Sequence, residues 1–465
     1  MQGGAISGDG DIGEDGDVVG GGGRPVQGII EGFYGRPWTW GERAEVMAWC
    51  HARGMTHYVY APKDDPLHRD RWRDPYPDAD LEGFAGLVAA GSLEVGFAIS
   101  PGLTMAYDDP ADRGALAAKV DQVVDAGIDL VCLALDDIPV RPGLGEEHAR
   151  VTAWLAAHLD GRARVVLVPT EYAGTWSTPY LDALAAGVPA EVPIAWTGST
   201  VVCDRITVAE AEARADVLGG RAPFLWDNYP VNDALMADRL FLGPLRGRDP
   251  GLLPRSSGYL ANPMVQPRAS TLPLSSVAAW LRGDDPDAAW VADAEELGWR
   301  TFAEACDGRV PGDLVAAVVS AWDGPGRRAA IERLHEWVVD AATCTAVGLE
   351  DEAGAWLDQV HTEADLARTA VGLLRTVDDA ARGELDRAGA VQRALAVGFV
   401  WRTVARSPVT VLGPRLALRP VLTQWPDGEF AYRSGSLEVG GNAVDRLCRF
   451  ALDRLAALTD EQLPR

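Results

Sequence analysis

Eight short apolar runs, each ending in a polar or charged group, recur roughly every 30 to 37 residues from residue 26 onward. They are rich in β-branched residues and nearly continuous in hydrophobicity, which is typical of strands buried on both faces of a parallel sheet. The runs are QGIIEGFYG (from 27), THYVYAPKDD (56), EVGFAISPG (94), DLVCLALDD (129), RVVLVPTEY (164), VPIAWTG (192), APFLWDNYP (222) and GYLANP (258). Because parallel strands need long crossover connections, this feature limits the fold more than any other.

Helical patterns lie between the runs and supply these connections. Examples are ERAEVMAWCHARG, RGALAAKVDQVVDAG and EEHARVTAWLAAHLDG, each ending on a glycine where a helix would stop. Eight strand–helix units over about 260 residues match a (β/α)8 barrel, so we predict an α/β fold with a TIM barrel followed by a C-terminal helical bundle. A doubly wound open sheet is the alternative, but it would gather its polar strand ends at one switch point.

The sequence changes character before and after the repeating section. The first 23 residues contain ten glycines, five acidic residues and no Lys or Arg. Residues 326–407 contain no proline and place apolar residues at helical spacing. We therefore expect a flexible Gly- and acid-rich tail over 1–24, a catalytic barrel over 25–283 and a mainly helical domain over 284–465.

The charge of the chain excludes several classes of partner. There are 42 Lys and Arg against 68 Asp and Glu, which gives a formal net charge of −26. Such a surface repels phosphate backbones and anionic lipid heads, so we expect neither nucleic acid nor a membrane as partner. The N-terminal residues lack the parts of a signal peptide. Six scattered cysteines without a CxxC pair indicate a reducing compartment, so we expect a cytoplasmic protein.

Asp136 and Asp137 are the strongest local signal for chemistry, because they directly follow the buried run LVCLAL. Two like charges beside a low-dielectric strand end favour a proton on one of them near neutral pH, as a glycosidase acid requires. Neighbouring side chains of an ideal strand point to opposite faces, but past the last ladder bond the backbone can turn both toward the mouth. The competing interpretation is a helix cap beside a surface ion pair.

Other chemistries have weaker support in the sequence. Paired aspartates also bind Mg²⁺, but such barrel sites usually recruit histidine, and none of the seven His follows an apolar run at the proposed mouth. There is no GxSxG motif for a serine nucleophile. The GGGG of the tail lacks the Lys and the preceding strand of a phosphate-binding loop. We therefore expect neither a metal site nor a cofactor.

Aromatic residues gather near the same strand ends. They are Trp196, Trp226, Tyr34, Tyr172 and Tyr229. The polar residues beside them are Asp227, Asn228, Asp233 and Asn262. Flat rings among such groups suit a sugar, because the rings stack on its apolar face while the polar groups bind its hydroxyls. A single Trp is more often a core residue, but this coincidence favours a sugar pocket.

Eight blocks of the sequence resemble, in unbroken order from about 27 to 282, the catalytic domain of family 84 glycoside hydrolases. That family comprises the protein O-GlcNAcases and related β-N-acetylglucosaminidases. The blocks are GIIEGFYGRPWTWGER, YVYAPKDDPLHRDRWRDPYP, ISPGL, LALDDI, PTEYAGT, WTGSTVV, LWDNYPVND and LFLGPLRGR followed by ANP. One block such as GFYG is weakly specific, whereas eight in order are highly specific. The helical region is also similar to that family's layout.

The resemblance implies a retaining exo-β-N-acetylglucosaminidase in which the 2-acetamido oxygen of the substrate attacks the anomeric carbon and forms an oxazoline. It implies that Asp136 accepts the acetamide N–H, and that Asp137 protonates the leaving oxygen and then activates water. It also implies a set of substrate-binding residues. These are Gly32, Lys63, Tyr172, Trp226, Asn228, Asp233 and Asn262.

The resemblance does not define the aglycone, which is the group to which the sugar is attached, because family members act on substrates with different aglycones. A GlcNAc-bearing glycoprotein or glycoconjugate fits the acidic chain better than hyaluronan, which is a polyanion. A hyaluronidase-like endo-acting enzyme and a non-catalytic GlcNAc-binding protein are the alternatives. Family analogy also implies a homodimer formed through the helical region.

Overall fold

The computed structural model describes residues 24–380, 387–404, 407–413, 417–418, 422–424, 430–432, 437–438 and 441–462. Its largest unit is a parallel sheet with strand order β5-β4-β3-β2-β1-β8-β7-β6. The strands are β1 (Gln27–Glu31), β2 (His57–Tyr60), β3 (Glu94–Ile99), β4 (Leu130–Ala134), β5 (Arg164–Val168), β6 (Ala195–Trp196), β7 (Phe224–Asp227) and β8 (Gly258–Ala261). A parallel bridge from Leu167 to Ile194 joins β5 to the segment before β6, so the barrel is nearly closed. The predicted (β/α)8 barrel is confirmed.

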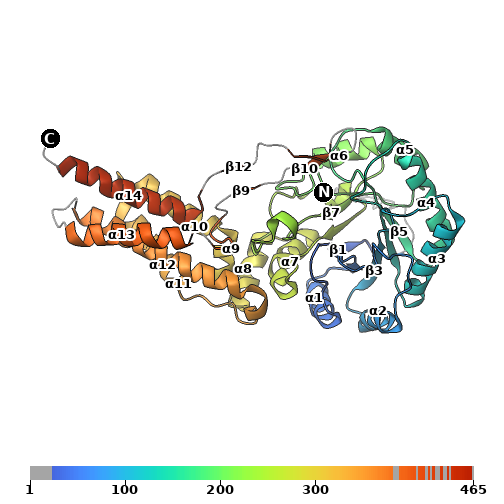
Figure 1. Cartoon of the computed structure of the whole chain (residues 1–465), viewed down its shortest axis with the longest axis horizontal. Helices are drawn as coiled ribbons and strands as arrows, with labels where there is room; N and C mark the ends of the chain where they lie inside the picture. Colours follow the sequence, from blue (N-terminus) through green and yellow to red (C-terminus); the bar gives the residue numbers. More distant parts are fainter. Residues whose placement is uncertain are drawn as a thin grey trace, which may run out of the picture.

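Helices cover the outside of the barrel (Figure 1). They are α1 (Trp40–Ala52), α2 (Asp78–Ala90), α3 (Pro110–Asp125), α4 (Leu144–Leu159), α5 (Pro179–Gly187), α6 (Val208–Val217) and α7 (Pro267–Arg282). Two 3-10 helices, η1 (Ala234–Met236) and η2 (Leu253–Arg255), lie between β7 and β8. Local signals set the helix starts: Thr39 forms a capping box with Glu42 at α1, and the Asp109 side chain caps α3.

Alternation along the strands divides their side chains into two layers. The inward layer fills the barrel and includes Ile30, Val59, Ala61, Ala98, Cys132, Ala134, Val166, Ala195, Trp226 and Leu260. The outward layer packs against the helices and includes Ile29, Tyr58, Phe97, Leu133, Leu167, Trp196, Leu225 and Tyr259. All eight strands end at one mouth, so an inward position just past a strand end faces that mouth.

Two carboxylates that end strands belong to the outward layer. Glu31 of β1 accepts from Arg43 Nε at 2.8 Å and from the hydroxyl of Tyr58. Asp227 of β7 accepts from Arg248 Nε at 2.8 Å and from the Tyr259 hydroxyl at 2.7 Å. Both ion pairs are almost completely buried. The expectation that Asp227 binds a sugar is therefore wrong, because β7 points this side chain away from the mouth and toward the helices.

Beyond the barrel the described chain is mainly helical, and Figure 1 shows these helices extending away from one side of the barrel. They are α8 (Pro286–Glu296), α9 (Arg300–Asp307), α10 (Arg309–Ala321), α11 (Arg327–Ala341), α12 (Glu350–Ala380), α13 (Arg387–Val404) and α14 (Ala443–Gln462). Four short strands, β9 (Ala417–Leu418), β10 (Leu422–Gln424), β11 (Phe430–Tyr432) and β12 (Leu437–Glu438), form two antiparallel pairs. The expected boundary between 283 and 284 falls between α7 and α8.

The helical region contacts the loop that follows β7. Trp356 Nε1 of α12 donates to the carbonyl oxygen of Asp238 at 2.9 Å, and the Thr410 amide donates to the same oxygen at 2.8 Å. Arg246 Nη1 pairs with Asp307 of α9 at 2.8 Å. The helices thus brace one wall of the barrel mouth. Of the predicted tail, residues 1–23 lie outside the described residues. No helix in the described ranges has the length and apolarity to cross a membrane.

Candidate active site

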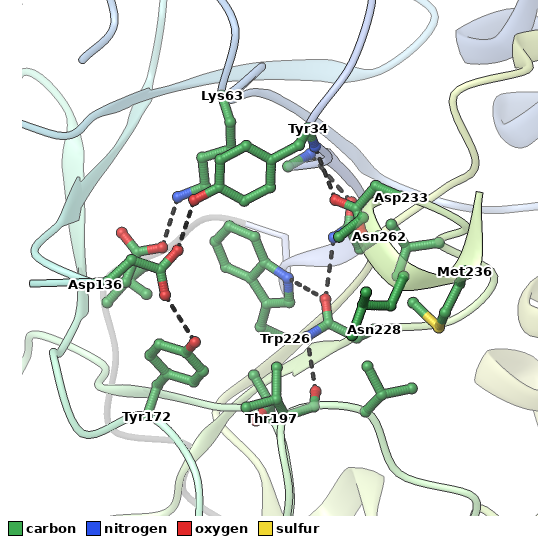
Figure 2. Close-up of a pocket in the computed structure, with 18 residues that line it drawn as sticks. Tyr34, Lys63, Asp136, Tyr172, Thr197, Trp226, Asn228, Asp233, Met236 and Asn262 are labelled. Atoms are coloured by element: carbon green, nitrogen blue, oxygen red, sulfur yellow. Dashed lines mark hydrogen bonds and ion pairs between the residues drawn. The ribbon is translucent and has the colours of Figure 1, made fainter. Parts of the chain in front are cut away.

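A cavity of about 210 Å³ opens at the carboxyl ends of the strands (Figure 2). It is lined by Gly32, Tyr34, Lys63, Asp136, Asp137, Val168, Tyr172, Thr197, Val201, Val202, Trp226, Asn228, Val231, Asp233, Ala234, Leu235, Met236 and Asn262. These residues follow every strand except β3. All nine residues that the family resemblance implies as catalytic or substrate-binding are among them, so the fold brings these nine together.

Four polar residues of the cavity continue the inward layer past the strand ends. Lys63, Asp136, Asn228 and Asn262 each stand two residues beyond a member of that layer. The period of two that fills the barrel with apolar side chains therefore also aims these four groups into the cavity. Their direction follows from strand geometry rather than from any special loop.

Asp136 is buried at the end of β4 and has one occupied oxygen. Its Oδ2 accepts from the buried Lys63 ammonium at 2.5 Å. Its Oδ1 is also buried, yet it has no hydrogen-bond partner among the described residues. The ammonium stabilises a negative charge on this carboxylate. The open oxygen is therefore a strong acceptor without a donor, which is costly unless a ligand supplies one.

Asp137 faces the same cavity because its backbone adopts a left-handed conformation, with φ of +54°. An extended backbone would send Asp137 to the outward layer, opposite to Asp136. A non-glycine residue in this region costs about 1–3 kcal/mol, so the turn is retained against a penalty. Two phenols hold the carboxylate: Tyr172 donates to Oδ1 and Tyr34 to Oδ2, each at 2.8 Å. The backbone turn that can bring both aspartates to the mouth is therefore present.

The two phenols are strongly affected by this environment. Burial, followed by the nearby Asp137 carboxylate, raises the pKa of both Tyr34 and Tyr172 well above the ordinary value. Both tyrosines therefore keep their protons and act as donors to Asp137 across the physiological pH range. Tyr172 is held by its loop, since the fully buried Arg214 donates to the carbonyl oxygen of Glu171 at 2.7 Å.

A chain of amides forms the opposite wall, as Figure 2 shows. Asn228 Oδ1 accepts from Trp226 Nε1 and from Asn262 Nδ2, both at 3.0 Å. Asn262 Oδ1 accepts from the Gly32 amide at 3.1 Å. This network fixes which atoms of each amide face the cavity. Gly32 permits close approach, because a Cβ there would lie 2.4 Å from the Trp226 ring.

Asp233 lies in the loop after β7 and borders the cavity beside Tyr34. Its Oδ2 accepts from the Tyr34 amide at 2.8 Å. Burial raises the pKa of its carboxyl, and the nearby Asp137 adds to the rise. Its carboxyl oxygens can accept a hydrogen bond from a ligand hydroxyl.

Two aromatic residues assigned to the rim from sequence lie elsewhere. Trp196 is fully buried in the outward layer and donates from Nε1 to the Gly174 carbonyl at 2.9 Å. Tyr229 donates to the Gly243 carbonyl at 2.5 Å and does not line the cavity. Both predictions are wrong, because a position near a strand end does not determine whether the side chain points into the barrel or away from it. Only Trp226 among these three belongs to the inward layer.

Several features of the cavity are not predicted from the sequence. The sequence places Tyr34 at the rim, but it does not predict the hydrogen bond from Tyr34 to Asp137, which joins two segments 103 residues apart. The apolar part of the mouth comes from Val202 after β6 and from Leu235 and Met236 of η1. No motif marks these three. For Tyr34 a signal existed, since it continues the inward period of Ile30 and Gly32.

One group in the described ranges has the composition of a metal site, at the other end of the barrel. It comprises His57, Glu94 and Asp129, whose ligand atoms lie within 4.8 Å of one another. The guanidinium of Arg164 already lies among them, with Nη2 at 3.1 Å from Glu94 Oε2 and 2.6 Å from His57 Nε2. The positive charge of Arg164 therefore already occupies this group, and we propose no metal there.

Comparison with known proteins gives a consistent result. The model of the family described as beta-N-acetylglucosaminidase matches residues 27–306, more than half of the chain. The protein O-GlcNAcases of Rattus norvegicus and Mus musculus are each 33% identical over 285 residues, covering 57% of this chain and 31% of theirs. The chain thus matches about a third of the length of these relatives. A mutant of the Thermobaculum terrenum O-GlcNAc hydrolase shares the fold, with a TM-score of 0.76 and 24% identity, covering 93% of this chain and 96% of that one.

Proposed function

Since this chain belongs to the beta-N-acetylglucosaminidase family of glycoside hydrolases, we propose that it releases terminal β-linked GlcNAc with retention of configuration. The observation that supports this most is the unpartnered Oδ1 of Asp136. In our proposal this oxygen accepts the N–H of the 2-acetamido group. That bond turns the acetamide carbonyl oxygen toward the anomeric carbon and stabilises the positive charge that develops on the amide as an oxazoline forms.

Asp137 serves as the acid and then the base in this proposal. Protonated, it gives its proton to the departing glycosidic oxygen; as a carboxylate it then takes a proton from the water that opens the oxazoline. The phenols of Tyr34 and Tyr172 hold its two oxygens, so the carboxyl keeps one orientation through both steps. The acetamide supplies the nucleophile, so the mechanism needs no covalent bond to the protein.

The remaining nominated residues would hold the sugar. The Trp226 ring would form an apolar wall. Asn228, Asp233, Asn262, Lys63 and the carbonyl of Gly32 would bind hydroxyls, and Tyr172 would also support the acetamide.

The aglycone that fits this proposal is a glycosylated Ser or Thr, or another GlcNAc conjugate. The net charge of −26 disfavours hyaluronan as a substrate of an endo-acting enzyme. The apolar mouth residues Val202 and Leu235 would contact the aglycone, since both are more than one-third exposed. A GlcNAc-binding protein without turnover would have the same pocket, but it would not need Asp137 as an acid and base.

We retain two further proposals about the protein's setting. All six cysteines are free, which supports a reducing compartment and thus a cytoplasmic location.

Helix α13 exposes Val391, Leu395 and Phe399 at a spacing of four, so one apolar stripe faces outward. A second copy covering that stripe would give the homodimer. Sedimentation of the chain at several concentrations would detect it.

Hydrolysis of 4-nitrophenyl β-GlcNAc distinguishes the enzyme from a binding protein. We expect turnover by the natural sequence, whereas saturable binding without product would favour the alternative. Asp137→Asn then tests the acid. It should lose about 10²–10⁴-fold on an alkyl β-GlcNAc but far less on the nitrophenyl substrate, whose leaving group needs little protonation. Equal losses on both would remove Asp137 from the acid role.

A further inference from the structure

Arg69 lies in the loop between β2 and α2 and is joined to the candidate acid through one phenol. Its Nη1 donates to the Tyr34 hydroxyl at 3.1 Å, and that hydroxyl donates to Asp137 Oδ2 at 2.8 Å. We propose, on the basis of the proposed function, that Arg69 is a positioning residue that fixes the direction of the Tyr34 hydroxyl and adjusts proton transfer at Asp137.

The direction of the hydroxyl follows from donor and acceptor capacity. A guanidinium can only donate, whereas a phenol can both donate and accept. Because the Tyr34 oxygen accepts from Arg69, its own proton points to Asp137. A Tyr34 hydroxyl turned the other way would accept a hydrogen bond from protonated Asp137, so that this proton would point at Tyr34 instead of the glycosidic oxygen. Arg69 therefore keeps the proton of the acid available to the substrate.

The charge of Arg69 also bears on Asp137. Among the described residues Arg69 has no carboxylate within 4.0 Å, so no direct ion pair neutralises it, whereas Arg73 and Arg248 each pair with an aspartate. Its guanidinium interacts electrostatically with Tyr34, Asp136 and Asp137. A cation near a carboxylate favours the ionised form. Arg69 thus places a positive charge next to the phenol that holds Asp137.

Other charged and titratable groups around Asp137 act in different directions. They are Tyr34 after β1, Lys63 after β2, Asp136 of the same loop, Tyr172 after β5 and Asp233 after β7. The negative charges of Asp136 and Asp233 repel a negative charge on Asp137, opposite to the attraction by Arg69. The Lys63 ammonium is paired with Asp136 at 2.5 Å, so its positive charge is largely neutralised by that carboxylate. Arg69 is the remaining cation whose hydrogen bond leads to Asp137.

The pH dependence of kcat/KM for an alkyl β-GlcNAc tests the proposal in the full chain. In Arg69→Gln the alkaline limb should move to higher pH by on the order of one unit, because the lost cation no longer favours ionisation. The plateau should fall by roughly tenfold, because the Tyr34 hydroxyl loses its fixed direction. Arg69→Lys should return the limb close to its original position.

Arg71→Gln is the matched control, because it removes the same charge from the same loop. Among the described residues Arg71 pairs with the exposed Asp74, and its side chain is 65% exposed, so the pH profile of this variant should match that of the natural sequence. An Arg69→Gln limb that coincides with that of Arg71→Gln would overturn the proposal. A natural sequence without turnover would instead overturn the proposed function, so the two failures are distinguishable.

A double-mutant cycle with Tyr34→Phe tests the relay through the phenol. Removing the hydroxyl alone should lower kcat more than it changes KM. In the Tyr34→Phe background, Arg69→Gln should then cost much less kcat than it does with Tyr34 present. Independent, additive losses would overturn the relay. Tyr34→Phe also keeps the proposal testable if Arg69→Gln fails to fold, because its own loss of kcat is required.

Discussion

The carboxylates at the barrel mouth fall into two groups that differ in direction. Glu31 and Asp227 point outward, and each is enclosed by a buried arginine and a tyrosine. Asp136 and Asp137 point inward, and one oxygen of Asp136 is buried without a partner. The same residue type, at the same kind of strand end, thus serves packing in one group and is open to a ligand in the other. For Asp136 the difference is one residue of strand register, whereas Asp137 reaches the cavity through its left-handed backbone turn.

Substitution of Asp136 is expected to have the largest effect on activity. In Asp136→Asn the amide oxygen will face Lys63, which leaves the NH₂ group opposite the acetamide N–H, donor against donor. We expect kcat/KM to fall by about 10²–10⁴-fold on alkyl and aryl substrates alike. Steady-state kinetics on both substrates measure this. A loss limited to the alkyl substrate would assign leaving-group protonation to Asp136 and would contradict its proposed role at the acetamide.

Substitution of an outward carboxylate should affect stability instead. Glu31→Gln leaves the buried Arg43 without a counter-charge, which costs about 3–5 kcal/mol. Urea denaturation should report this loss, while kcat/KM of the folded enzyme stays within a few fold.

The matched control for this substitution replaces both partners. Glu31→Leu with Arg43→Met removes the unpaired charge and should regain much of the lost stability. If Glu31→Gln instead abolished turnover in a protein of unchanged stability, the outward group would belong to the active site and the comparison would fail.

Acid should affect the barrel through buried histidines, which sharpens the separation between stability and chemistry. Burial lowers the pKa of His68 and of His148 to about 3. The unfolded chain therefore binds more protons between pH 3 and about 6.5, so stability is complete above 6.5 and falls on acidification. Each histidine contributes about 1.4 kcal/mol per pH unit over that range.

Urea midpoints between pH 7 and 5 measure this effect. His148→Gln should flatten the dependence, and the exposed-surface change His51→Gln should leave it as it is. A slope unchanged by His148→Gln would contradict the assignment of acid sensitivity to the buried ring.

The sequence predicts the barrel well because buried parallel strands leave a continuous apolar signal and their ends carry the polar groups. It also places Asp136, Asn228 and Asn262 correctly. Trp196 and Asp227 were misassigned although the period of two already points them outward. Counting register from the inward residues would have corrected both, so this part of the site was available from sequence.

Other features depend on contacts that no local pattern reveals. The left-handed backbone at Asp137 requires a strained conformation that the surrounding structure maintains. The bonds from Tyr34 and Tyr172 to Asp137 join loops separated by many residues. The position of Arg69 follows from the same loops.

The rate of hydrolysis across a series of aryl glycosides with zero to three fluorines on the N-acetyl group tests the central claim most directly. Each fluorine withdraws electrons from the carbonyl oxygen and weakens it as a nucleophile. If Asp136 aligns that oxygen for attack, log kcat/KM will fall steadily with each added fluorine. A rate that is independent of fluorination would mean that a group of the protein attacks the anomeric carbon, and would contradict the account.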